Sequence, residues 1–423
     1  MRAAVSQLIL DFEIPVGKRD DDEGDLVDLR VLHSEQEYFD AKRVAAPQYK
    51  VTLPRPFRET ALVDDTGWRH RPRPAWAAKD LGARMWRNLP DSIRNSILNG
   101  TPSSPQRVAV LSTRCGMDDI PWEWVTDGEQ PIAAMDSVRF IRLVPARYAS
   151  PLLKVSLPIR VLIVVTNPKE DRLLLPEVEI DVITQGLREN AAYKFDVLME
   201  PRFEKLKECL ENFSPNILHY VGHSGVSGSM GNLILHDEGT GTRWISPAEL
   251  SRVLPASVRL LCLSTCVTRE NYHVGGLSKF AHATPETQLP TTITNQYALH
   301  ESNARLFWQR FYPALVEFNG NSVEALHSAR LALFAQHEDS WCWASFSIVV
   351  RDGSGHSLQI ADSIPKSEEQ YSKELQAQWS ARLANNLATR MLSLSEDVQK
   401  HWQPTLDDEV ARTESLENEL SNE

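Results

Sequence analysis

Two segments of the chain end in a histidine and a cysteine, residue types that together support nucleophilic catalysis. His223 follows the apolar run Ile217–Val221, and Cys266 follows the apolar run Val258–Leu263. A free thiol is only a few per cent ionised at neutral pH, and a neighbouring imidazolium favours the reactive thiolate. The imidazole can then return its proton to a leaving amine. The two residues therefore predict a Cys/His nucleophilic pair, provided that the two runs are neighbouring strands.

The elements that must position this pair alternate between short β-branched runs and amphipathic segments from about Ile159, which is typical of βαβ units. In an open parallel sheet, catalytic groups gather outside the carboxyl ends of strands that lie ~4.8 Å apart, so His223 and Cys266 are expected to face each other across the rim. The predicted strands are Ile159–Val165, Phe195–Leu198, Ile217–Val221, Val258–Leu263, Thr291–Thr294 and Phe346–Val350. The predicted helices are Val178–Arg188, Phe203–Phe213, Pro247–Val253, Asn303–Phe318 and Ser322–Phe334, and a hairpin is predicted from Leu233–Leu235 to Arg243–Ile245.

The residues before this alternation predict a separate N-terminal region. Its predicted elements are a long-looped hairpin of Leu8-Ile9-Leu10 with Leu26–Leu32, a helix from Ala75 to about Ile97, and strands at Arg107–Leu111 and Val138–Leu143. We interpret residues 1–150 as a catalytically inert companion layer that supports the domain with the chemistry, residues 151–355. Trp122 and Glu123 are expected to be structural residues of this companion region.

Beyond residue 355 the sequence predicts an amphipathic helix. Apolar side chains recur every four residues, which places them along one face of a helix. These side chains belong to Tyr371, Leu375, Trp379, Leu383 and Leu387. We interpret residues 356–423 as a helical, acidic extension that packs against the rest of the chain or against a partner.

Composition and charge exclude several classes of function. The 423 residues include 45 Lys and Arg against 57 Asp and Glu, and this formal charge of −12 opposes binding to phosphate backbones. Nowhere do ~18 uncharged apolar residues follow one another, as a membrane-spanning helix requires. The five cysteines are odd in number and have no framework-like spacing, which favours a reducing compartment. We therefore expect a cytoplasmic chain with no nucleic-acid or membrane partner.

Several short motifs follow one another between about Trp76 and Val350. They are Ile120-Pro121-Trp122-Glu123-Trp124, Leu175-Pro176 with Glu179, His219-Tyr220-Val221-Gly222-His223, Leu263-Ser264-Thr265-Cys266, Gly276-Leu277-Ser278-Lys279-Phe280, Phe311-Tyr312 and Trp343-Ala344-Ser345-Phe346. In this order they resemble the CHAT family of caspase-like cysteine peptidases, which is related in fold to caspases and separases. His223 precedes Cys266 by 43 residues, close to the ~50 of caspase-type enzymes.

The resemblance implies a fold and a catalytic site. The fold is an α/β caspase-like αβα sandwich with a mostly parallel sheet, preceded by a smaller α+β companion region. The activity is peptide-bond hydrolysis with Cys266 as nucleophile, His223 as general base and then acid, and neither a metal nor an organic cofactor. Main-chain groups of Ser224 or Gly225 are expected to join that of Cys266 in an oxyanion hole. Ser264, two residues before the nucleophile, is expected to border the pocket for the substrate side chain.

The resemblance also implies partners. Prokaryotic members of the family often resemble regulated executioners in antiviral defence or cell death, so we expect a protein substrate such as a pore-forming protein. An activator or regulatory protein is expected to act through the C-terminal helix. The segments that we expect to restrain the enzyme are the loop Thr268–Val274, the insertion Gly228–Gly241 and the tail helix 366–400.

Three alternatives compete with this hypothesis. In a catalytically silent scaffold or binding module, the residue after His223 need not be glycine, and here Ser224 precedes Gly225. His219 and Cys262 could complete a Cys2His2 zinc site with the predicted pair, but residues four apart on a strand are separated by ~13 Å, too far for bonds of ~2 Å to one ion. We expect these two residues to be packed in the core. The segment Gly222–Val226 also comes within one residue of the serine nucleophile elbow Gly-x-Ser-x-Gly.

Overall fold

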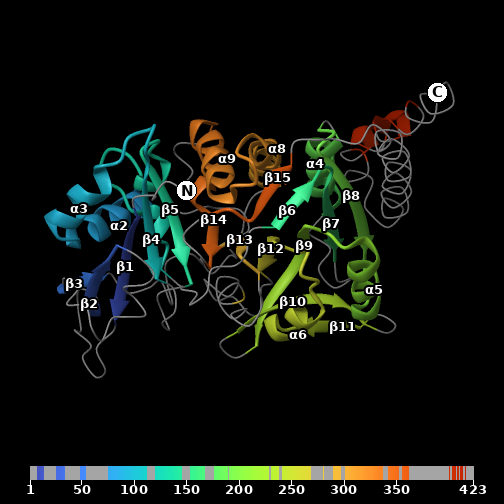
Figure 1. Ribbon diagram of the computed structural model, residues 1–423, viewed down its shortest axis with the longest axis horizontal. Helices are drawn as coiled ribbons and strands as arrows, with labels where there is room; N and C mark the ends of the chain where they lie inside the picture. The colour runs from blue at the N-terminus through green and yellow to red at the C-terminus, as the bar shows by residue number, and fades with distance from the viewer. Residues whose placement is uncertain are drawn as a thin grey trace.

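A large sheet organises the part of the chain that the computed structural model describes. The described residues are 7–13, 25–33, 48–53, 75–111, 120–144, 153–166, 176–188, 190–227, 230–237, 241–267, 280, 289–296, 301–336, 342–351, 355–361, 400, 403–405, 407–408, 410–412 and 415. Thirteen strands form this sheet in the order β11-β10-β9-β12-β13-β14-β5-β4-β1-β2-β3, and β7 lies between β8 and β9 (Figure 1).

The strands of the large sheet are β1 (Gln7–Glu13), β2 (Asp25–Leu32), β3 (Gln48–Leu53), β4 (Gln106–Leu111), β5 (Val138–Leu143), β7 (Ile159–Val165), β8 (Tyr193–Met199), β9 (Ile217–Ser227), β10 (Met230–His236), β11 (Thr242–Ile245), β12 (Leu260–Val267), β13 (Thr291–Asn295) and β14 (Phe346–Val350). Two further strands, β6 (Leu153–Ser156) and β15 (Leu358–Ala361), pair with each other in parallel. The residues of β15 are therefore strand, although they belong to the extension that we predicted to be helical.

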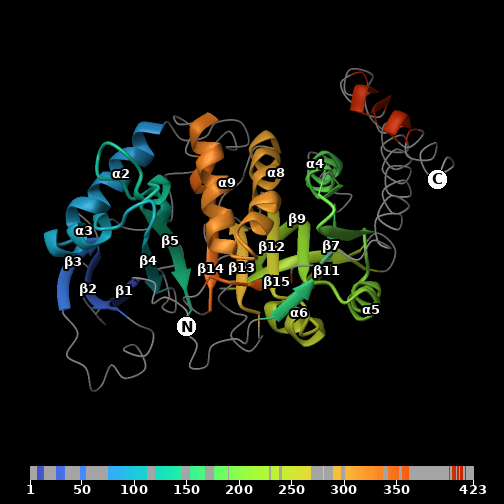
Figure 2. The same cartoon turned by 45° about the horizontal axis from the view of Figure 1, so that its top comes forward.

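Helices cover both faces of the sheet. They are α2 (Ala75–Asn88), α3 (Asp91–Leu98), α4 (Pro176–Arg188), α5 (Phe203–Phe213), α6 (Pro247–Val253), α8 (Glu301–Glu317) and α9 (Ser322–Gln336), with short 3-10 turns η1 (Trp122–Trp124), η2 (Ile132–Ala134) and η4 (Cys342–Ala344). Helices α4, α8 and α9 lie on one face, and α5 and α6 lie on the other (Figures 1 and 2). The predicted α/β sandwich with a mostly parallel sheet is confirmed.

Local sequence explains why these elements form. Strand β7 and the first part of β9, Ile217–Val221, are mainly apolar because helices cover both of their faces. Successive residues of β9 enter opposite cores, so Ile217 and Val221 join one apolar cluster while Leu218 joins the other. Helix α6 begins with a capping box, in which Ser246 and Glu249 satisfy each other's main-chain N–H groups.

The strands of the N-terminal region continue the same sheet edge to edge. Strand β14 joins the two halves, since it pairs with β13 in antiparallel orientation and with β5 in parallel orientation. Strands β1, β4 and β5 therefore run opposite to β7, β9, β12 and β13. The predicted hairpins β1–β2 and β10–β11 are confirmed by their antiparallel registers.

The helix predicted from Ala75 to about Ile97 is wrong in its continuity. The chain forms two helices, and Pro90 stands at the junction as the N-cap of α3 with an extended backbone, ψ 146°. Proline lacks the N–H that a continuous helix needs and disfavours helical backbone in the residue before it. The apolar spacing survives across the break, so Leu81, Met85 and Ile93 are all buried.

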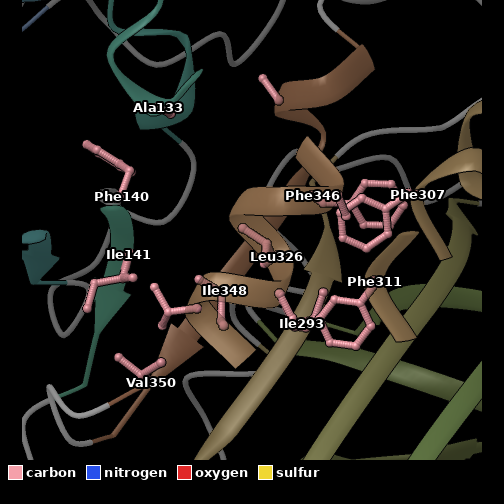
Figure 3. Packing of buried hydrophobic residues seen from close by; sticks show 14 of the residues in the cluster. Ala133, Phe140, Ile141, Ile293, Phe307, Phe311, Leu326, Phe346, Ile348 and Val350 are labelled. Atoms are coloured by element: carbon pink, nitrogen blue, oxygen red, sulfur yellow. The ribbon is translucent and has the colours of Figure 1, made fainter. Parts of the chain in front are cut away.

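Aromatic packing consolidates the junction between the two halves. Phe307 of α8 stacks on Phe346 of β14 with ring centroids 3.6 Å apart. Figure 3 shows these rings close to Ile293 of β13 and Ile348 of β14, with Ile141 of β5 beyond them. The core is therefore continuous across β13, β14 and β5, and the companion region and the rest of the chain share it.

No helix in the described part of the chain combines the length and the apolar composition that crossing a membrane requires. The predicted stripe from Tyr371 to Leu387 lies outside the described residues. Further along the chain, Arg412 donates to the Asp181 carboxylate of α4 over 3.0 Å. This ion pair ties the end of the chain to α4.

Candidate active site

Strands β9 and β12 are parallel neighbours, and their register brings the two predicted catalytic positions together. Cys266 is the register partner of His223, in a ladder that runs from Leu260↔Ile217 to Val267↔Ser224. Paired positions on neighbouring strands are ~4.8 Å apart. Both residues lie toward the carboxyl ends of their strands, where parallel sheets carry their sites. We call His223 and Cys266 the outer pair.

The same two strands carry a second Cys/His pair. Cys262 is the register partner of His219, four residues before the outer pair on each strand. We call His219 and Cys262 the inner pair. A separation of four residues places both pairs on the same face of the sheet, ~13 Å apart along the strands.

The inner pair is sealed beneath α8. His219 and Cys262 are both 0% exposed, as predicted for packed residues. His219 Nδ1 lies 2.7 Å from the Tyr312 hydroxyl, and the His219 ring packs 4.3 Å from that of Trp308. Tyr312 also forms a side-chain hydrogen bond with Cys262. The side chains of the inner pair therefore have fixed partners within the core.

Burial keeps the inner pair uncharged. Desolvation lowers the pKa of His219 to about 3. It also raises the pKa of Cys262, against a smaller opposite effect of the hydrogen bond with Tyr312. Both shifts have the same cause, because a low-dielectric core disfavours the charged form of each group. At neutral pH the inner pair consists of a neutral imidazole and a thiol, so it contains no nucleophilic thiolate.

The other predicted site residues lie next to the outer pair along the strands. Ser264 is the register partner of Val221 and is buried, with 6% of its surface exposed. Ser224 pairs with Val267 on one side and with Leu233 of β10 on the other, and Gly225 pairs with Asn232. The register thus places Ser224 and Gly225 where β9 meets β10.

The structure reveals a requirement for Gly222 that our sequence analysis missed. A Cβ atom at this position would lie 2.6 Å from the main-chain oxygen of Thr166, a separation that real Cβ atoms do not tolerate. Thr166 comes directly after β7 and donates its N–H to Val221 O over 2.9 Å. The chain must therefore pass β7 closely just before His223, and only glycine fits. Packing therefore demands glycine at the position directly before the histidine.

A buried polar cluster connects the companion region to the end of β13. Arg142 of β5 is 0% exposed and donates to both carboxylate oxygens of Glu123, over 3.1 and 2.8 Å. Gln296, directly after β13, accepts from Arg142 over 2.8 Å and donates to Glu123 over 2.6 Å. Desolvation acts to raise the pKa of Glu123, but Arg142, Arg330 and Gln296 together outweigh it and the net shift is downward.

This cluster confirms that Trp122 and Glu123 are structural, since both are buried. Our sequence analysis missed Arg142 and Gln296 as their partners. A charged residue inside the apolar run Val138–Leu143 was the available signal, because a buried arginine requires an anionic or hydrogen-bonding partner.

Two of the alternatives from the sequence, a metal site and a serine nucleophile, are compared with the structure as follows. Among the described residues, no group of three or more His, Cys, Asp and Glu side chains is arranged to hold a metal ion. The serine elbow hypothesis is wrong, because it requires a sharp strand-to-helix turn at the nucleophile. Here β9 continues as strand through Ser224 to Ser227 and then pairs with β10.

Comparisons with known proteins add the following findings. No family model and no curated protein sequence matches the chain. The separase of a Saccharomyces cerevisiae separase–securin complex is 17% identical, with a TM-score of 0.37 over 61% of this chain and 16% of the separase chain. The Arg-specific cysteine proteinase gingipain R is 12% identical, with a TM-score of 0.41 over 69% of this chain and 70% of that chain. A complex of the pro- and mature domains of Porphyromonas gingivalis RgpB is 12% identical, with a TM-score of 0.40.

Proposed function

We propose that this chain is a caspase-like cysteine endopeptidase whose catalytic dyad is the outer pair. The observation that supports the proposal most directly is the register Cys266↔His223 at the carboxyl ends of two parallel neighbours. The motif order described above further supports membership of the CHAT family. The contrast with the inner pair adds a physical argument, because the same two residue types are kept neutral when they are buried.

The reaction follows from the chemistry of the pair. His223 takes the proton of the Cys266 thiol, and the thiolate attacks the carbonyl carbon of the scissile peptide bond. Main-chain N–H groups of Cys266 and of Ser224 or Gly225 stabilise the resulting oxyanion; one such donor is worth on the order of 3 kcal/mol. The C–N bond then breaks as His223 gives its proton to the leaving amine. Water attacks the thioester carbonyl carbon as His223 takes its proton. The C–S bond then breaks, and His223 returns the proton to the leaving Cys266 sulfur, which releases the acid and the free thiol.

The substrate and its control are part of the proposal. We assign the border of the side-chain pocket to Ser264, whose small neutral side chain supplies no charge to select a basic or acidic residue. The substrate is a partner protein such as a pore-forming effector, cleaved in a regulated prokaryotic defence or cell-death response in the cytoplasm. An activator acts through the C-terminal helix.

Restraint of the enzyme is assigned to the three segments predicted from the sequence. Within the predicted insertion Gly228–Gly241, Met230–His236 forms strand β10 and pairs with β9 directly beside the outer pair. The loop Thr268–Val274 and, except for Lys400, the predicted tail helix 366–400 lie outside the described residues. Of the predicted restraint segments, the structure thus describes the strand pairing of β10, which lies next to β9.

A peptide library cleaved by the purified chain and read by mass spectrometry tests the activity. Because the enzyme is proposed to be restrained, we expect slow basal cleavage by the wild type, background cleavage by Cys266→Ala, and cleavage at the wild-type rate by the matched control Cys262→Ala. Equal cleavage by all three proteins would show that Cys266 is not the nucleophile and would overturn the proposed dyad.

Thiol alkylation separates the peptidase from a catalytically silent scaffold without knowledge of the substrate. With iodoacetamide at neutral pH, Cys266 should react faster than the other four cysteines by about tenfold or more, because an activated thiolate is the reacting species. Slow and equal reaction of all five would favour the scaffold.

A further inference from the structure

Strand β9 changes partners at the outer pair. Its ladder with β7 ends at Val165↔Val221, and its ladder with β10 begins at Ser224↔Leu233. Both ladders lie on the same edge of β9, opposite β12. Gly222 and His223 therefore lie between two ladders, and we call this position the fork.

A buried hydroxyl group, that of Tyr220, forms hydrogen bonds with both strands that diverge at the fork. The Tyr220 hydroxyl donates to Ile234 O over 2.7 Å and accepts from Ile234 N–H over 3.2 Å. It also lies 2.7 Å from Thr166 Oγ1. Because the Tyr220 proton is directed to Ile234 O, Thr166 must be the donor in this third bond. The hydroxyl thus connects Thr166, directly after β7, to Ile234, the residue at which β10 separates from β9.

These bonds replace the next step of the β9–β10 ladder. A continued antiparallel register would place Ile234 opposite His223. Instead, the N–H and C=O of Ile234 both bond the Tyr220 hydroxyl, so β10 leaves β9 at that residue. Tyr220, Thr166 and Ile234 are 2%, 1% and 4% exposed, so water does not supply substitutes for these bonds.

We propose that Tyr220 and Thr166 are positioning residues for His223. The proposal deepens the proposed function, because it concerns the geometry of the same dyad. Removing the Tyr220 hydroxyl leaves the buried N–H and C=O of Ile234 without these bonds. Their nearest replacement is the main chain of His223, so β10 closes onto the fork and the histidine shifts relative to Cys266. The hydroxyl group thus keeps Ile234 of β10 from pairing with the main chain of His223.

The test uses Tyr220→Phe, which removes only the hydroxyl group, and Thr166→Val as a second, nearly isosteric variant if the first fails to fold. Tyr193→Phe is the matched control, because its buried hydroxyl donates to Tyr312 O over 2.7 Å away from the fork. The titration of His223 is followed by NMR of ring-labelled histidines, with the His223 signal assigned by its loss in His223→Gln. The kcat and KM for a peptide cleaved by the wild type, and the pH profile of Cys266 alkylation, are measured in parallel.

We expect the fork variants to move the His223 titration midpoint by about half a pH unit or more and to lower kcat about tenfold with little change in KM. Tyr193→Phe should change neither, even where it lowers the melting temperature equally. An unchanged His223 titration in a folded fork variant overturns the positioning role. If the wild type cleaves no peptide while the His223 titration still moves, the proposed function fails and the positioning role stands.

Discussion

The inner and outer pairs contain the same residue types, in the same register, on the same two strands. Only their depth along the strands differs, by four residues. Beneath α8, burial lowers the pKa of His219 and raises that of Cys262, so both are neutral at neutral pH. The outer pair lies toward the carboxyl ends of the strands, and we assign the chemistry there. A Cys/His pair in register can therefore be kept neutral by burial, as the inner pair is.

Substitution of the two histidines gives the most direct test of the difference between the outer and the inner pair. A general acid–base group contributes about 10²–10⁴-fold to rate, so His223→Ala should lower kcat/KM by that factor. His219→Gln, on the same strand and face, should keep kcat/KM within about threefold when assayed below its melting temperature. Equal losses in the two variants would erase the distinction between the pairs.

A second expectation extends the contrast to Glu123, a buried charge far from the outer pair in sequence. Glu123→Gln leaves Arg142 buried without its anionic partner and should lower the free energy of unfolding by about 3–5 kcal/mol, measured by urea denaturation. Asp91→Asn, which breaks an exposed ion pair with Arg94, is the control and should change it by less than about 0.5 kcal/mol. The rate of Cys266 alkylation in folded Glu123→Gln should stay at the wild-type value, and a large fall would give Glu123 a role at the site.

The neutral state of His219 predicts a dependence of stability on pH. Its unfolded pKa is about 6.5, whereas its folded pKa is about 3, so between these values the unfolded chain binds the additional proton. Stability from this group is complete above the unfolded pKa and falls as the pH drops, by about 1.4 kcal/mol per unit. Urea unfolding of wild type and His219→Gln from neutral pH to about pH 4.5 should therefore show a shallower loss in the variant. Parallel curves would mean that the pKa of His219 is the same in the folded and the unfolded chain.

The smallest effect is expected from Tyr312→Phe. It removes the hydroxyl that bonds both members of the inner pair and should lower the free energy of unfolding by about 1–2 kcal/mol. Cys266 alkylation should keep its wild-type rate. A loss of reactivity comparable to that of His223→Ala would show that the inner pair takes part in the chemistry.

Much of the fold was predictable because burial leaves a local record in the sequence. The apolar run Ile159–Val165 is a strand with those same limits, and Phe203–Phe213 is a helix with those same limits. The break at Pro90 was also available locally, although the apolar periodicity that continues across it concealed the break. The prediction of His223 and Cys266 as a pair rested on the strand-like runs before them, on their interval of 43 residues and on the ordered motifs around them.

The cluster of Glu123, Arg142 and Gln296 was not predictable in the same way. Arg142 is separated from Gln296 by 154 residues, and no pattern in the sequence around either residue indicates that the other is its partner. Their contact depends on β14 joining β13 to β5, which is a choice of strand order. The requirement for Gly222 likewise depends on Thr166, which lies far away along the chain.

The sequence by itself determined the types and limits of most elements, the charge, and the pair of residues to which we assign the chemistry. Those properties follow from side-chain periodicity and from the chemistry of single residues. Only the tertiary structure decided which strands are neighbours, that both halves share one sheet, that the inner pair is buried, and where β9 changes partners at the fork. Such features depend on contacts between segments distant in the chain, and many strand orders are compatible with the same local pattern of burial.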